Sequence, residues 1–183
     1  MMEFERVLRV SKDRLGVIIG SGGSQKAFIE KTFKVKVTFN GGLVKIESSD
    51  NKSDPVTATA YIEALARGFS PYSASDLIDG RAVMMELDLR DYVSTKNSLV
   101  RIRGRLIGTN GSARSKIEQL TETKISIYGD HVSIIGKPDN VKLSADAVKD
   151  LIMGSRHASV FAKLERHRST MKKDRLKLWE TGV

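Results

Sequence analysis

The 183-residue sequence contains no cysteine. This absence excludes disulfide bridges, a thiol nucleophile and zinc held by cysteine, and it fits a reducing compartment. Aromatic residues make up only 6 % of the chain, so any buried core must be mainly aliphatic. No apolar run approaches the roughly 18 residues of a membrane span, and the amino-terminal stretch has no apolar signal core. We therefore expect a soluble intracellular protein. We further expect it to be cytoplasmic and monomeric, with no metal or cofactor.

Positive charge is in clear excess. The net charge is +9, from 31 basic and 22 acidic residues, and the isoelectric point is near 9.8. This balance suggests a polyanionic partner, with nucleic acid as the first candidate and an anionic membrane as the second. Solubility alone would also account for it. With 40 % apolar residues, the chain can form a buried core and is long enough for one large or two small domains.

The chain resembles itself when it is shifted by 88 positions. Glycines are matched by glycines, and apolar residues by apolar residues at alternating positions. A shared segment of this length indicates two copies of a domain rather than the short units of a solenoid. The shift pairs Gly16 with Gly104, Gly20 with Gly108, Gly23 with Gly111, Glu30 with Glu118, Val37 with Ile125 and Phe39 with Ile127.

Each copy predicts the element order β-α-α-β-β-α. The first strands are expected at 4–10 and 82–89, and strands of period-2 alternation follow the second helix of each copy. Asp54-Pro55 and Lys137-Pro138 are typical of helix starts. The fold class is thus α+β. We predict domains at 1–70 and 82–155, a linker at 71–81 and a basic amphipathic helix at 156–183.

A double-glycine turn separates the first two helices of each copy. A phosphate-binding P-loop needs a lysine directly after its last glycine, but Ser24 and Ser112 stand there. The dinucleotide fingerprint needs a different glycine spacing. A plain helix connector remains possible, as does a grip on a nucleic-acid backbone.

The order β-α-G-x-x-G-α-β-β-α, with Ile19-Gly20 and Ile107-Gly108 entering the turns, resembles a KH domain in both copies. The resemblance implies type I KH domains whose glycine loops hold a sugar-phosphate backbone while bases lie over an apolar groove. That groove would be lined by Ile18, Ile19, Ile29, Val37 and Phe39 in the first copy and by Leu106, Ile107, Ile117, Ile125 and Ile127 in the second, most of which also serve the core.

The second loop has the richer basic surroundings, so we rank it as the stronger site. The positions between the outer glycines carry no charge in either loop, although KH loops often have a lysine or arginine there. The residues assigned to RNA contact are Gly20, Ser21, Gly22, Gly23, Lys26, Arg103, Arg105, Ile107, Gly108, Thr109, Asn110, Gly111, Arg114 and Lys116.

The second half also carries motifs of a narrower family. These are G-R-x-I-G at Gly104–Gly108, Arg114 three residues after the loop, and G-S-x-H-x-x-V followed by an aromatic residue at Gly154–Phe161. Together they resemble the Pno/Dim-type, or partner-of-Nob, proteins of ribosome assembly, in their archaeal form. One departure is Ser112, where the family usually has lysine.

This resemblance implies a non-catalytic role in maturing the small ribosomal subunit. Such proteins bind single-stranded rRNA near its 3′ end, work with the Nob-type endonuclease and can contact a translation initiation factor. A KH protein of RNA decay or translation initiation and a protein-only adaptor are alternatives. A metal-dependent nuclease would have to use Glu86, Asp88 and Asp91, with His131.

The tail from Arg156 to Val183 holds eight basic and three acidic residues, a net of +5. Val160, Leu164, Met171 and Leu178 predict one apolar seam on a helix with a basic back. The basic face would either contact rRNA or simply face water. A membrane-surface helix is disfavoured because Trp179 is the only aromatic residue after Phe161.

Overall fold

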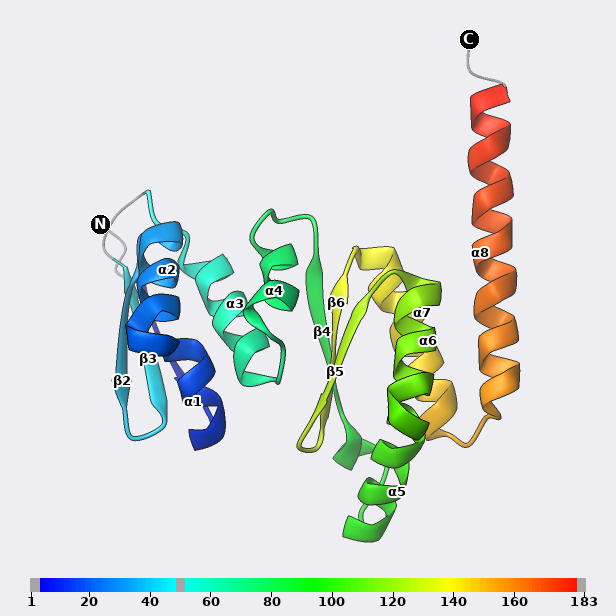
Figure 1. The fold of residues 1–183 in the computed structure, drawn as a ribbon, viewed down its shortest axis with the longest axis horizontal. Coiled ribbons are helices and arrows are strands. Elements are labelled where there is room, and N and C mark those ends of the chain that lie inside the picture. Colours follow the sequence, from blue (N-terminus) through cyan, green and yellow to red (C-terminus); the bar gives the residue numbers. More distant parts are fainter. Residues whose placement is uncertain (1–3, 49–51, 181–183) are drawn as a thin grey trace. The chain divides into compact units, whose positions relative to one another are not determined.

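The structure is a computed structural model that describes residues 4–48 and 52–180, with side chains in the last helix as far as Lys173. The chain divides into two compact units, 1–84 and 85–183. Both units place helices against a three-stranded sheet (Figure 1). Within the described residues, no helix is long and apolar enough to cross a membrane.

The first unit follows the predicted order of elements. The sheet has the strand order β1-β3-β2, and its strands are antiparallel. The elements are β1 (Phe4–Arg9), α1 (Lys12–Ile19), the 3₁₀ turn η1 (Ser21–Gly23), α2 (Ser24–Phe33), β2 (Lys36–Asn40), β3 (Leu43–Ser48), α3 (Pro55–Ala66), α4 (Pro71–Ala74) and the 3₁₀ turn η2 (Ser75–Leu77).

The second unit repeats that order and adds a long helix at its end. The sheet order is β4-β6-β5, and α8 packs along α6 and α7 before continuing beyond them (Figure 1). The elements are β4 (Val83–Asp88), the 3₁₀ turn η3 (Leu89–Asp91), α5 (Lys96–Ile107), the 3₁₀ turn η4 (Thr109–Gly111), α6 (Ser112–Thr121), β5 (Lys124–Tyr128), β6 (His131–Gly136), α7 (Pro138–Ile152) and α8 (His157–Glu180).

Strand register follows the period-2 pattern. Val37 lies opposite Ile46 in the first sheet, and Ile125 lies opposite Ile134 in the second. These side chains are all 5 % exposed or less, so one face of each hairpin forms the floor of its unit's core. The core of the second unit is completed by aliphatic residues of α5, α6, α7 and α8, as the low aromatic content predicts.

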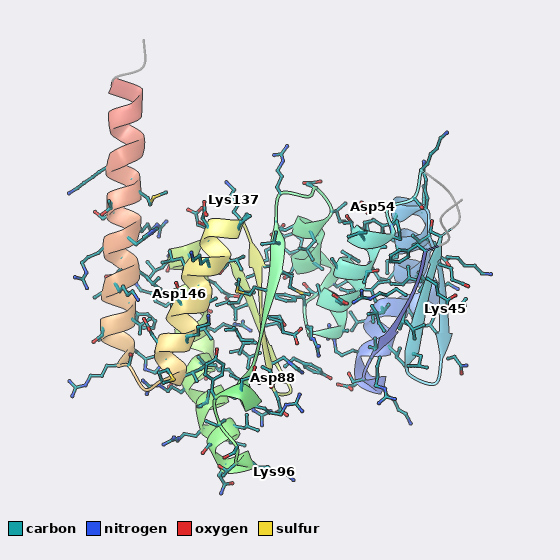
Figure 2. The ribbon with its side chains drawn as sticks, turned by 180° about the vertical axis from the view of Figure 1, so that it is seen from behind. Lys45, Asp54, Asp88, Lys96, Lys137 and Asp146 are labelled. Atoms are coloured by element: carbon teal, nitrogen blue, oxygen red, sulfur yellow. The ribbon has the colours of Figure 1, made fainter. Side chains whose placement is uncertain are left out.

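The third helix of each unit starts where the sequence indicates. Asp54 accepts a hydrogen bond from the Thr57 backbone N–H at 3.0 Å and so caps α3 (Figure 2). Pro55 and Pro138 occupy first-turn positions, where the missing N–H costs nothing. Lys137 precedes α7 in an extended conformation but gives no side-chain cap.

Both units join the second helix to the following strand in the same way. Lys34 and Glu122 close α2 and α6 in the left-handed region, each with a φ of 53°. The Val37 N–H donates to Glu30 Oε1 at 2.9 Å, and the Ile125 N–H donates to Glu118 Oε1 at 2.7 Å. The match of Glu30 with Glu118 in the shifted sequence therefore has a physical reason, because each carboxylate satisfies a strand donor.

The shift of 88 does not extend to the first strands. β1 and β4 begin 79 positions apart, because the second unit inserts η3 and a longer first helix before its glycine turn. Residues 71–81, expected as a linker, contain α4 and η2, which pack on α3 and bury Ala74 and Leu77. The structure places this segment in the first unit.

The bond from Ile125 to Glu118 can be tested by substitution. Glu118→Ala should lower the free energy of unfolding by about 1–2 kcal/mol, because a partly buried N–H loses its acceptor. Glu118→Gln keeps a carbonyl oxygen and should cost less than half as much. The measurement is chemical denaturation together with hydrogen exchange of the Ile125 amide. Equal losses in the two variants would contradict this role.

Candidate nucleic-acid interface

The two glycine turns have nearly the same backbone conformation. The first glycines, Gly20 and Gly108, have φ/ψ of 75°/170° and 71°/177°, and the last, Gly23 and Gly111, have 80°/11° and 80°/9°. The third position is left-handed in both turns, with φ of 57° at Gly22 and 51° at Asn110. Asparagine is one of the few residues with a side chain that tolerates this region.

The first and last glycines are required for different reasons. A Cβ on Gly20 would lie 2.6 Å from the Gln25 nitrogen, and one on Gly108 would lie 2.7 Å from the Ala113 nitrogen, so the turn touches the next helix. A Cβ on Gly111 would meet nothing within 4 Å. The last glycine thus leaves an open approach to the backbone, which a second chain or a phosphate can use.

The helices that follow the turns begin without a side-chain cap. Gly23 and Gly111 are the N-cap residues of α2 and α6, and neither helix has an acidic residue in its first turn. Their first backbone N–H groups therefore carry partial positive charge with no carboxylate nearby on the helix. Such a helix start favours the oxygen atoms of a phosphate. Ser21 and Thr109 are exposed at the tips of the turns.

Cations surround the second turn, but several are already paired. Arg114 Nε lies 3.6 Å from Glu118 Oε2, and its side chain is 43 % exposed. Lys116 Nζ lies 2.9 Å from Glu165 Oε1 and so ties α6 to α8. Arg103 donates to the Gly129 carbonyl at 3.1 Å, which fixes it against the β5–β6 turn. Surface pairs of this kind are weak and can exchange for a stronger anion.

The first turn has fewer cations than the sequence suggests. Lys26 lies 3.8 Å from Glu30 and stands over the Phe39 ring at 5.9 Å. Arg14, which lies on α1 before this turn, donates instead to the carbonyls of Leu65 at 2.8 Å and Phe69 at 2.6 Å. Its guanidinium thus closes the carboxyl end of α3, where orphan carbonyls need donors.

Arg105 makes the corresponding contact in the second unit. It donates from Nε to the Leu151 carbonyl at 2.9 Å and from Nη2 to the Ser155 carbonyl. In return, His157 Nε2 lies 2.9 Å from the Arg105 carbonyl. We call Arg105, Leu151, Ser155 and His157 the helix clamp. Arg105 was assigned to RNA contact from the sequence, but its guanidinium is held by the joint between α7 and α8.

The helix clamp explains part of the G-S-x-H-x-x-V motif. Ser155 offers its carbonyl to Arg105, and His157 reaches the last turn of α5. Val160 is buried, and the Phe161 ring lies 5.9 Å from that of His157. The sequence singled out this segment, but only the structure shows that it holds α5, and with it the start of the glycine turn.

The predicted groove residues fall into two classes. Three in each unit are buried, and two in each unit are partly exposed at matching positions: Ile19 and Phe39 in the first, Ile107 and Ile127 in the second. Ile107, at the end of α5 beside Gly108, is 38 % exposed. These exposed residues are available to contact bases, while the others are committed to the core.

Two of the acidic residues weighed for a nuclease, Glu86 and Asp88, are engaged otherwise. Asp88 accepts hydrogen bonds from the Arg90 side chain at 2.8–3.2 Å and from its backbone N–H, and these bonds lower the pKa of Asp88 to about 2 (Figure 2). Glu86 lies 2.9 Å from His131 Nδ1. Among the described residues, no group of three or more potential ligands is placed to hold a metal ion.

The apolar seam of the last helix is only partly used. Val160 and Leu164 are buried against the second unit, whereas Met171 is 51 % exposed. The side chains of Leu178 and Trp179 lie outside the described residues. Lys163 pairs with Asp150 of α7 at 2.9 Å. The helix is therefore attached along its first half.

Comparison with known proteins gives a consistent picture. A family model of the second KH domain of PNO1 proteins, a eukaryotic-type KH domain (KH-domain type I), matches residues 83–169. The KH domain-containing protein MJ0443 of Methanocaldococcus jannaschii is 38 % identical over 95 % of this chain and 78 % of its own length. The pre-rRNA-processing protein PNO1 of Chaetomium thermophilum is 28 % identical over 61 % of this chain and 44 % of its own length.

A solved structure resembles most of the chain. It is the a/eIF2alpha–aDim2p–rRNA complex from Pyrococcus horikoshii, and the matched chain is 35 % identical with a TM-score of 0.85. The match covers 92 % of this chain and 96 % of that one. The similarity thus includes both units.

The two roles of the glycines predict different outcomes for alanine. Gly108→Ala should cost about 3 kcal/mol or more, because the new Cβ collides with α6 and the backbone conformation is strained. Gly111→Ala should cost about 1–2 kcal/mol, from its left-handed φ alone. Thermal denaturation measures both. A loss at Gly111 as large as that at Gly108 would contradict the open approach.

The helix clamp predicts that Arg105 stabilises the junction between α7 and α8 more than Arg103 does. Arg105→Gln should lower the free energy of unfolding by about 2 kcal/mol and speed hydrogen exchange in the first turns of α8, because two carbonyls lose a charged donor. Arg103→Gln, an equal change of charge on the same helix, should cost less than about 1 kcal/mol. Similar exchange rates in the two variants would refute the clamp.

Proposed function

Because the chain belongs to the PNO1/Dim2 family of KH-domain proteins, we propose that it is an RNA-binding factor of rRNA processing with two KH domains. The observation that carries this proposal is the second glycine turn. Gly111 leaves its backbone open, and α6 begins there without a cap or an acidic residue. Those features suit the phosphates of a single strand.

The second unit would provide the main grip. KH loops hold about four nucleotides, and Arg114 lies one turn into α6 from the open glycine. Arg103 and Arg101 lie on α5, on the other side of the turn. The bases would lie against the exposed parts of Ile107 and Ile127. Arg105 would act indirectly, because the helix clamp fixes α5.

The first unit would bind RNA more weakly. Its turn has the same backbone conformation, but Arg14 is held by two carbonyls and Lys26 by Glu30 and Phe39. The cations around the second turn are also paired, but most of them are arginines, whose planar guanidinium can donate two hydrogen bonds to one phosphate. The backbone of Gly20–Gly23 can still contribute a secondary contact.

Family membership supports a finer proposal. We infer that the RNA is the single-stranded 3′ end of the small-subunit rRNA and that the protein assists a Nob-type endonuclease without itself being catalytic. The Pyrococcus complex combines aDim2p and rRNA with a/eIF2alpha, and a contact with a translation initiation factor belongs to the same proposal. We place this work in the cytoplasm and assign it to a monomer.

Acidic substitutions in the two turns test the proposal. Thr109→Asp/Asn110→Asp should weaken binding of a 3′-end rRNA fragment at least tenfold, because two carboxylates would face the phosphates; asparagine and aspartate both tolerate the turn conformation. Ser21→Asp/Gly22→Asp should weaken it less than about threefold. Fluorescence anisotropy across a salt series, with a scrambled RNA of equal length, measures both.

The neutral variant Thr109→Ser is the control for the substitution itself. Wild-type binding that shows no preference for the rRNA sequence at physiological salt would contradict the rRNA assignment. Equal losses from the two acidic pairs would contradict the ranking of the turns. RNA binding that survives both pairs together would leave the glycine turns without a role in recognition.

A further inference from the structure

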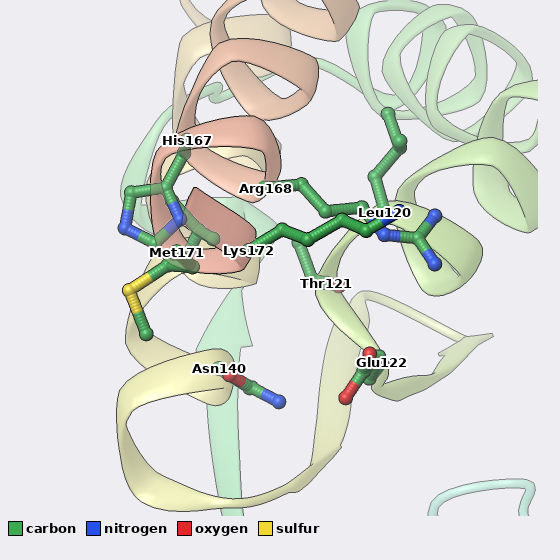
Figure 3. Close-up of a pocket in the computed structure, with 9 residues that line it drawn as sticks. Leu120, Thr121, Glu122, Asn140, His167, Arg168, Met171 and Lys172 are labelled. Carbon is green, nitrogen blue, oxygen red and sulfur yellow. The ribbon is translucent and has the colours of Figure 1, made fainter. Parts of the chain in front are cut away.

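A pocket of about 360 Å³ opens at the end of α6 that lies away from the glycine turn. It is bounded by the end of α6, the first two turns of α7 and the middle of α8 (Figure 3). Leu120, Leu143 and Met171 supply its apolar walls. The volume lies within the range of pockets that hold small ligands in proteins.

The exposed Met171 marks this pocket. The apolar seam of α8 is buried at Leu164 but not two turns later, where a gap separates α8 from α6 and α7. An exposed apolar side chain beside a hollow of this size indicates a surface that can bury more apolar area on binding. The side of α8 that lines the pocket is therefore only partly covered by the chain itself.

The pocket has cations on one side and hydrogen-bonding groups on the other. Arg168 and Lys172 come from α8, and across from them lie Glu122 and Asn140 (Figure 3). Lys163, earlier on α8, and Lys116 of α6 are paired with carboxylates, but the structure gives Arg168 and Lys172 no carboxylate partner among the residues it describes. Their charge is available to an external anion.

We propose that this pocket is a second RNA contact that takes one nucleotide of the strand held at the glycine turn. The base would lie against Met171 and Leu143, and the adjoining phosphate would meet Arg168 and Lys172. The inference rests on the proposed RNA-binding function and extends the RNA path along α6, whose ten residues span about 15 Å.

Glu122 favours a nucleotide over an acidic peptide. Its carboxylate accepts hydrogen bonds from an amino group on a base edge, which an acidic side chain cannot offer, while the phosphate would lie across the pocket at Arg168 and Lys172. Asn140 can both donate and accept. A nucleotide combines a flat apolar face, amino or carbonyl groups at its edge and a phosphate, which together match the three kinds of side chain in the pocket.

The test compares short and long RNAs with matched double variants. Arg168→Gln/Lys172→Gln removes the two pocket cations, and Arg166→Gln/Lys173→Gln removes two exposed cations of the same helix that do not line the pocket. With an RNA of about four nucleotides, enough for one KH loop, neither variant should change affinity much. With an RNA about three times longer, the pocket variant should bind roughly tenfold more weakly than the control variant.

A second variant tests the base contact. Met171→Asp places a charge on the half-exposed wall, so it should leave the fold intact and weaken only the longer RNA, by roughly fivefold to tenfold. Equal losses in the two double variants would overturn the proposal, since α8 would then act only as a general positive field. Unchanged affinity of the pocket variants for the longer RNA would also overturn it and would leave an acidic protein segment as the alternative ligand.

The outcome is separable from that of the proposed function. If wild-type protein binds both RNAs and the acidic pair at the second turn abolishes binding, the function stands whatever the pocket variants show. If the acidic pair has no effect on either RNA, the failure lies with the glycine turn itself, and the pocket cannot be an extension of its path.

Discussion

The close approach of each glycine turn to the helix that follows it is the constraint on which the rest of the molecule depends. With Gly108 set against Ala113, α5 and α6 meet at a fixed angle, and the second of the two helices starts with uncapped N–H groups. A side chain at Gly108 would push the helices apart and move those donors. The same contact at Gly20 gives the first unit the same turn, so local sterics position the phosphate-binding groups before any charge is considered.

Charge in this protein is used in two distinct ways. Arg14 and Arg105 satisfy carbonyls at helix ends and so stabilise the frame. Near the second turn, Arg103 donates to a single carbonyl and Arg114 forms a weak surface pair. A basic composition therefore overstates the charge that faces a ligand. The two turns are alike in backbone geometry, and the second ranks first because more of its cations are arginines, which can bind one phosphate through two hydrogen bonds.

The element order, the turn positions and the alternating core were predictable from the sequence, because glycine spacing and period-2 patterns are local signals. The pairing of Glu30 with Glu118 was visible in the shifted sequence, although its reason, a hydrogen bond to the next strand, was not. The clamp role of Arg105 could not be predicted, since its carbonyl partners lie 46 and 50 positions away. The apolar seam of α8 also could not reveal that Met171 borders a pocket. Periodicity identifies the apolar face of a helix but not the elements that face it.

Arg14 and Arg105 make equivalent contacts in the two units, although they do not align in the sequence. Aligned on the glycines, Arg14 falls on Ile102 and Arg105 falls on Val17, so neither arginine has a matching residue. Yet each guanidinium binds two carbonyls that are four residues apart, those of Leu65 and Phe69 in the first unit and of Leu151 and Ser155 in the second. In the aligned units the two arginines stand three positions apart, which places them on the same face of the helix. The similarity of the two units is thus better preserved in their hydrogen bonds than in their residue identities. A comparison of residue identities alone underestimates how closely the two units are related.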